Sequence, residues 1–103
     1  MGKLNLTTNR ENDTLTVQAV GRIDTGNYIE FEKAINAEID GVKNIVLDFE
    51  KLDYISSSGL RVLISLHKML LSEDGKLTVR HPTTMVREVF DVTGFTEMIN
   101  IEN

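Results

Sequence analysis

The chain has 103 residues, of which 41% are hydrophobic and 26% charged, the size and composition of one globular domain that needs no disulfide or metal to fold. Its formal net charge of -5 argues against nucleic acid as a partner, and the absence of cysteine excludes a disulfide scaffold, thiolate zinc sites and a thiolate nucleophile. No stretch resembles a signal peptide or reaches the roughly 20 apolar residues of a membrane span, so we expect a cytoplasmic protein without a membrane partner.

Two strands and an amphipathic helix are predicted first in the chain. Residues 4–6 and 15–21 both alternate apolar and polar side chains, which indicates two strands of an antiparallel hairpin. Over residues 28–39 the apolar spacing changes to three and four, which indicates a helix. Asp24 or Thr25 is the expected N-cap of this helix.

Strands and helices alternate in the second half of the chain. Residues 44–49 (NIVLDF) are almost continuously apolar, which predicts a strand covered on both faces. A helix of about four turns follows three consecutive serines, with Leu71 in its apolar stripe, and residues 76–81 form the next strand. A third helix, starting at Thr83 or its neighbour Thr84, precedes a short last strand near the C-terminus.

The predicted order of elements is therefore β-β-α-β-α-β-α-β. Strands that alternate with single helices require right-handed parallel crossovers, so we expect an α/β protein with a mixed β-sheet and helices packed on it. No repeat, linker or low-complexity segment interrupts this pattern, and a single domain is expected to fill residues 1–103.

The three serines, Ser56, Ser57 and Ser58, lie between an apolar strand and an apolar-striped helix. Functional sites in open α/β sheets gather beyond the carboxyl ends of the strands, and a helix that starts there has unpaired N–H groups and a partial positive charge. Ser56 or Ser57 as the N-cap would contribute about 1 kcal/mol. One serine suffices for a cap, so capping leaves the triplet before Gly59 partly unexplained.

A hydrolase would need a general base for Ser57, and the sequence offers two histidines. His67 lies roughly 15 Å along the helix from Ser57, and its place on the apolar stripe predicts a boundary histidine with its hydrogen bonds satisfied. His81 ends a strand on the same rim and could approach, but the G-x-S-x-G turn and an oxyanion loop are missing. Distant histidines and scattered acids also lack metal-ligand spacing, so we expect no catalytic, metal or cofactor site.

Phosphorylation is the third hypothesis for Ser57. A phosphate adds about -1.5 to -2 charges, which the start of a helix accepts without unfolding. Arg61, four residues later, could reach back to the phosphate. The modification would then change the charge of a contact surface while leaving the fold intact.

The segment NIVLDFEKLDYISSSGLRVLI resembles the central motif of the STAS domain found in bacterial anti-sigma factor antagonists. The segments VQAVGRIDTGNYIEFEKAI and VREVFDVTGF are similar to the first and the C-terminal helical regions of that family, so the resemblance covers nearly the whole chain. It implies the STAS fold. It also implies a non-enzymatic regulator that, when unphosphorylated, binds an anti-sigma factor serine kinase and so releases a sigma factor.

The resemblance assigns the phosphorylated serine to Ser57, followed by Ser58 and Gly59. Phosphorylation by the kinase breaks the complex, and a serine phosphatase restores the unmodified form. The family's usual aspartate before this serine is Ser56 here, which removes a negative charge and makes Ser56 a competing acceptor.

We expect the partner to contact Asp24, Asp53, Arg61 and the residues from Ser56 to Gly59. Asp24 could instead be a plain helix cap, and Asp53 could order the serine loop or begin a turn. The alternative function is a non-switching STAS subunit of a transport or signalling assembly.

Overall fold

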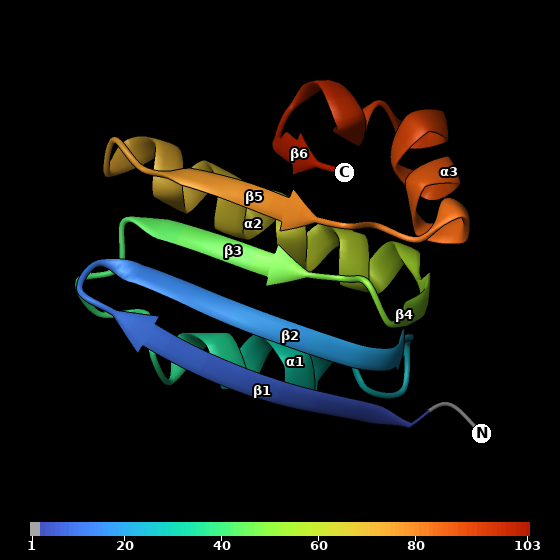
Figure 1. The fold of residues 1–103 in the computed structure, drawn as a ribbon, viewed down its shortest axis with the longest axis horizontal. Coiled ribbons are helices and arrows are strands. Elements are labelled where there is room, and N and C mark those ends of the chain that lie inside the picture. The colour runs from blue at the N-terminus through green and yellow to red at the C-terminus, as the bar shows by residue number, and fades with distance from the viewer. Residues whose placement is uncertain (1–2) are drawn as a thin grey trace.

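The computed structural model describes residues 3–103 and contains one mixed sheet of six strands, three α-helices and a short 3-10 helix (Figure 1). The strands are β1 (Leu4–Glu11), β2 (Thr14–Ile23), β3 (Asn44–Asp48), β4 (Leu52–Ile55), β5 (Lys76–Arg80) and β6 (Asn100–Glu102). The helices are α1 (Tyr28–Asn36), α2 (Ser57–Ser72), α3 (Thr84–Thr93) and the 3-10 helix η1 (Phe95–Glu97). The α/β class and the mixed sheet are confirmed, but the predicted order lacked β4 and η1.

The strand order in the sheet is β1-β2-β3-β5-β6, with β1 antiparallel to β2 and the other neighbours parallel. The first half of β2 pairs with β3, and its residues 21–23 pair with β4, with a register shift between Gly21 and Arg22. The predicted order had no strand between residues 44–49 and the serine helix, and this was wrong because Leu52–Ile55 form β4. The pairing of β4 depends on β2, which is distant in sequence, and a strand of four residues has too few positions for its alternation to be recognised.

Helices α1 and α2 both lie behind the sheet in Figure 1, on the same face. The strand β3 reflects this: Ile45 and Leu47 are buried, and Val46 between them is only half-buried. The prediction that this strand is covered on both faces was therefore wrong. Its apolar run reflects one buried face and a β-branched residue on the other, a position that valine fills well in any strand.

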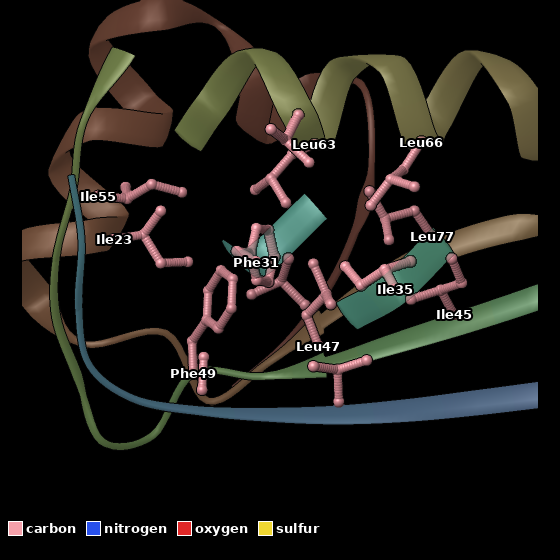
Figure 2. Packing of buried hydrophobic residues seen from close by; sticks show 14 of the residues in the cluster. Ile23, Phe31, Ile35, Ile45, Leu47, Phe49, Ile55, Leu63, Leu66 and Leu77 are labelled. Atoms are coloured by element: carbon pink, nitrogen blue, oxygen red, sulfur yellow. The ribbon is translucent and has the colours of Figure 1, made fainter. Parts of the chain in front are cut away.

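The hydrophobic core lies between these two helices and the sheet (Figure 2). The face of α2 that packs inward is centred on Leu63, Leu66 and Leu70. Leu71, one position further round, is 56% exposed, so its predicted place in the apolar stripe was wrong. Each fully buried large apolar side chain contributes about 1.5–3 kcal/mol. This core holds the ends of β2 and β4 and the start of α2 in fixed positions. Within residues 3–103 no helix is long and apolar enough to cross a membrane.

Candidate functional site

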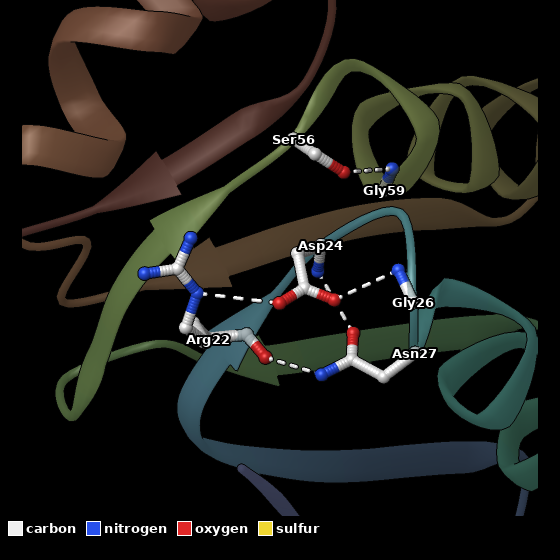
Figure 3. A network of polar contacts seen from close by, with 6 residues as sticks. All are labelled: Arg22, Asp24, Gly26, Asn27, Ser56 and Gly59. Atoms are coloured by element: carbon white, nitrogen blue, oxygen red, sulfur yellow. Dashed lines mark hydrogen bonds and ion pairs between the residues drawn. The ribbon is translucent and has the colours of Figure 1, made fainter. Parts of the chain in front are cut away.

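The serine corner joins the end of β4 to the start of α2, beside the end of β2. The N–H of Ser56 donates to the carbonyl of Ile23 at 2.9 Å, and the Oγ of Ser56 accepts from the N–H of Gly59 at 3.2 Å (Figure 3). Ser56 is only 6% exposed. Of the two predicted caps, Ser56 is the N-cap of α2.

The two serines that follow the cap differ from it in exposure. Ser57 is the first residue of α2 and is exposed, whereas Ser58 is half-buried. Neither side chain forms a hydrogen bond within residues 3–103. The corner therefore divides its hydroxyl groups between a buried structural one on Ser56 and an accessible one on Ser57.

Gly59 allows the first turn of α2 to lie directly on the ends of β2 and β4. A Cβ atom at this position would be 2.6 Å from Cγ2 of Ile23 and 2.9 Å from Cγ1 of Ile55. Since the helical backbone itself does not require glycine, the requirement comes from packing. The glycine after the triplet, left unexplained by capping alone, thus keeps the exposed serine close to the end of β2.

Asp24 begins a tight turn between β2 and α1. Its Oδ1 accepts from the N–H of Gly26 at 2.9 Å, and its own N–H donates to Oδ1 of Asn27 at 2.8 Å (Figure 3). Neither Asp24 nor Thr25 is the N-cap of α1, which is Asn27. The prediction was wrong because Asp24 hydrogen-bonds the turn that it begins, as aspartate commonly does, and the helix starts only after that turn.

Arg22 connects this turn to β4. Its Nε lies 3.3 Å from Oδ2 of Asp24, and its guanidinium carbon lies 4.7 Å from the ring centroid of Tyr54. Solvent-accessible ion pairs and cation–π contacts each contribute up to about 1 kcal/mol, so the main effect is to orient the Asp24 carboxylate. Sequence reasoning missed Arg22 and Asn27, although the period-two alternation places Arg22 and Asp24 on the same side of the strand end.

The other two predicted contact residues are both exposed. Asp53 lies on β4, and its side chain forms no hydrogen bond or ion pair within residues 3–103, so the structure gives no sign that it orders the serine loop. Arg61 lies one turn after Ser57 and is likewise without an ion-pair partner in the described part of the chain. A shallow depression of about 160 Å³ separates α1 from α2 beside it and is lined by Tyr28, Glu32, Ser58, Arg61, Val62 and Ser65.

Neither histidine side chain forms a hydrogen bond to the serine corner within residues 3–103. His81 is exposed, with a positive φ of 54°, and its side chain makes no hydrogen bond to Ser57 or to any other residue within 3–103. The buried Nδ1 of His67 has no hydrogen-bond partner, so the prediction of a satisfied histidine was wrong. Among residues 3–103, no three His, Cys, Asp or Glu side chains are grouped so that they could hold a metal ion.

Nearly the whole chain is similar to one known protein family. The family model of the STAS domain matches residues 5–103. The chain belongs to the STAS domain family. The serine corner is thus the start of the second helix of a STAS domain, and its cap, Ser56, is hydrogen-bonded to the last residue of β2.

Two relatives named for the same role align along almost the whole chain. BtrV of Bordetella bronchiseptica, which carries the provisional name of anti-sigma factor antagonist, is 34% identical over 101 residues, covering 97% of this chain and 87% of BtrV. The anti-sigma-B factor antagonist of Staphylococcus aureus is 23% identical over 99 residues, covering 95% of this chain and 92% of that protein.

Solved structures share the STAS fold. An anti-sigma factor antagonist from Mycobacterium paratuberculosis superposes with a TM-score of 0.87 and 22% identity, over 98% of this chain and 86% of the other. The anti-sigma factor antagonist SpoIIAA in its unphosphorylated form gives a TM-score of 0.82 and 21% identity, over 98% and 89% of the two chains. At these identities the likeness establishes the fold.

Proposed function

We propose that this STAS domain is an anti-sigma factor antagonist controlled by phosphorylation of Ser57. Its unphosphorylated form binds an anti-sigma factor that is also a serine kinase, and the sigma factor held by that kinase is released. The observation that carries the proposal is the difference between two neighbouring serines. The Ser56 hydroxyl is buried and caps α2, whereas the Ser57 side chain is exposed and forms no hydrogen bond within residues 3–103. The names of the relatives from Bordetella and Staphylococcus support the same role.

In the phosphorylation reaction this chain supplies only the nucleophile, the hydroxyl group of Ser57. The kinase transfers the γ-phosphoryl group of ATP to Oγ of Ser57, a base of the kinase takes the hydroxyl proton, and ADP leaves. A serine phosphatase reverses the modification by hydrolysis to serine and inorganic phosphate. This chain supplies a rigid helix start for both partners and is not itself an enzyme.

Phosphorylation is expected to break the complex without unfolding the domain. The new charge of about -1.5 to -2 lies at the positive end of α2, where it is stabilised, with Arg61 one turn away. At a contact surface with the kinase the same charge must be desolvated, and burying it unpaired weakens binding by roughly 30-fold or more. Asp24, Asp53 and Arg61 are proposed to lie in that contact surface with the serines and Gly59.

The decisive experiment combines the purified protein with a candidate kinase and ATP, followed by intact mass, mapping of the modified residue and affinity measurement. We expect one phosphate on Ser57 and loss of kinase binding, with neither change in Ser57→Ala. Stable binding without phosphate would contradict the switch and indicate a non-switching subunit. A phosphate on Ser56 or Ser58 would overturn the assignment of the residue while retaining the role.

A further inference from the structure

The outer edge of β1 carries a row of unused backbone hydrogen-bonding groups. The two-residue turn after β1 makes Glu11 and Thr14 a hydrogen-bonded pair, so β1 bonds to β2 through its odd-numbered residues. At the other end the N–H of Arg22 donates to the carbonyl of Lys3 at 3.3 Å, as this pattern requires. The N–H and C=O groups of the even-numbered residues within 4–10 therefore point away from the sheet.

This edge lacks the features by which proteins usually protect exposed strands. Within residues 3–103, β1 pairs only with β2, has no proline and keeps an unbroken register, and it is longer than the opposite edge strand β6. Arg10, the charged residue among the outward-bonding positions, is held by the carbonyls of Glu38 at 3.1 Å and Asp40 at 2.6 Å. Its guanidinium is thus fixed against the segment that follows α1, and the backbone of β1 remains available.

We propose that β1 binds β1 of a second copy of this chain, antiparallel, about a twofold axis that passes beside Thr7. In such a pair the numbers of facing residues add to a constant, and this sum must be even for the outward-bonding residues to face one another. With the twofold axis beside Thr7 this condition is met, and residues 3–11 of the two strands overlap completely. Leu4 then faces the partner's Arg10, and Leu6 faces the partner's Thr8.

The side chains of β1 are complementary to themselves in this register. On the open face of the sheet, Lys3 meets the partner's Glu11, Asn5 meets the partner's Asn9, and Thr7 meets the partner's Thr7. Opposite charges at the two ends of one strand give two symmetric ion pairs only when the strand pairs with its own copy. A shift by two residues in either direction separates both ion pairs. One of these shifts brings Lys3 opposite Asp13, but Asp13 lies in the turn beyond the end of β1, so charge favours the register centred on Thr7.

The dimer leaves the serine corner accessible. β2 lies between β1 and β4 in the sheet, so a second copy on β1 extends the sheet away from Ser57. The inference does not rest on the phosphorylation proposal, and either can fail without the other.

A single introduced cysteine tests the register, because the chain has none of its own. In Thr7→Cys the two thiols belong to a non-hydrogen-bonded pair with Cα atoms about 4.5 Å apart, within disulfide range. Asn9→Cys is the matched control on the same strand and face, since its two thiols would be separated by roughly 13 Å. Under mild oxidation we expect a disulfide-linked dimer from Thr7→Cys only. Equal yields from the two variants, or none from either, would overturn the register.

Charge variants test the dimer by sedimentation equilibrium. Glu11→Lys places lysines opposite each other at both ends and should raise the dissociation constant about tenfold at low salt, without altering the circular dichroism spectrum. The double variant Lys3→Glu with Glu11→Lys recreates both ion pairs and should restore the affinity. A monomer at every soluble concentration of the unmodified protein, or a dimer indifferent to both variants, would refute the proposal.

Discussion

Helices α2 and α3 begin in the same way but in different surroundings. Each follows a hydroxyl N-cap, Ser56 or Thr83, whose side-chain oxygen accepts from the N–H three residues later, at 3.2 Å in α2 and 3.4 Å in α3. Each cap is followed by an exposed hydroxyl residue, Ser57 or Thr84. An exposed hydroxyl at a helix start is therefore not distinctive by itself.

The difference lies one turn further along each helix. Ser57 is followed at that spacing by Arg61, which forms no ion pair within residues 3–103, and Thr84 is followed by the acidic Glu88. Arg87, the nearest cation to Thr84 on α3, is hydrogen-bonded to Asn103 and lies 3.9 Å from Asp91. A phosphate is thus favoured at the start of α2 and opposed at the start of α3, although both starts are capped.

The largest expected effect distinguishes these two hydroxyl groups. Ser57→Ala should abolish phosphorylation by the cognate kinase, because it removes the accepting oxygen. Thr84→Ala should leave the rate and extent unchanged, because its hydroxyl lies beside Glu88. Intact mass after incubation with kinase and ATP measures both variants.

Both variants remove an exposed hydroxyl from the first turn of a helix, so each controls for the stability effect of the other. Phosphate that persists in Ser57→Ala and disappears in Thr84→Ala would reverse the comparison.

The next effect concerns how closely α2 lies on the sheet. Gly59→Ala should lower the free energy of unfolding by about 2–3 kcal/mol, since its Cβ would lie 2.6 Å from Cγ2 of Ile23. Gly26→Ala is the matched control, because a Cβ there meets only Oδ1 of Asp24, at 3.4 Å. Urea denaturation measures the difference between the two variants. Equal stabilities would show that the helix start can shift without penalty.

The two caps should make smaller and similar contributions. Ser56→Ala and Thr83→Ala should each reduce the free energy of unfolding by about 1 kcal/mol. Thr83→Ala should be the more harmful of the two, because the Thr83 hydroxyl also donates to the carbonyl of Leu52 at 2.8 Å. Chemical denaturation measures both.

Ser56→Ala has a second readout, since Ser56 is the competing acceptor expected from the sequence. The variant should still be phosphorylated on Ser57 by its kinase. Loss of phosphorylation in a folded Ser56→Ala protein would mean that the buried cap, rather than the exposed serine, accepts the phosphate.

The parts of this protein that could be predicted are those determined by local periodicity. Helix α2 and the hairpin of β1 and β2 follow from spacing and side-chain chemistry within a few residues, and both were predicted. The cap of α2 was narrowed to Ser56 or Ser57, and the structure selects Ser56. The start of α3 was predicted at Thr83 or Thr84 for the same reason, and the helix begins at Thr84 with Thr83 as its cap.

The parts that could not be predicted depend on residues distant in sequence. β4 forms because the end of β2 turns away from β3 and offers it a partner, and Gly59 is needed because Ile23 and Ile55 come within van der Waals distance of α2. Which face of β3 is covered depends on where both helices pack. At the site, the exposure of Ser57 could be inferred from its helix, whereas the link from Arg22 to Asp24 required the tertiary structure.

The smallest expected effect tests the cation that separates the two helix starts. In the phosphorylated protein Arg61 should stabilise the start of α2 by about 0.3–0.5 kcal/mol, the usual contribution of an ion pair one turn apart on a helix. The rise in melting temperature on phosphorylation should therefore be smaller in Arg61→Ala than in the unmodified sequence. Arg61→Lys should retain much of the rise because it keeps the charge. Arg87→Ala should leave the rise unchanged, because Arg87 belongs to α3.

A rise that is the same in all four proteins would mean that the N–H groups of the first turn alone bind the phosphate. Ser57 would then be distinguished from Thr84 by its place beside the end of β2 and by the absence of an acidic residue on α2.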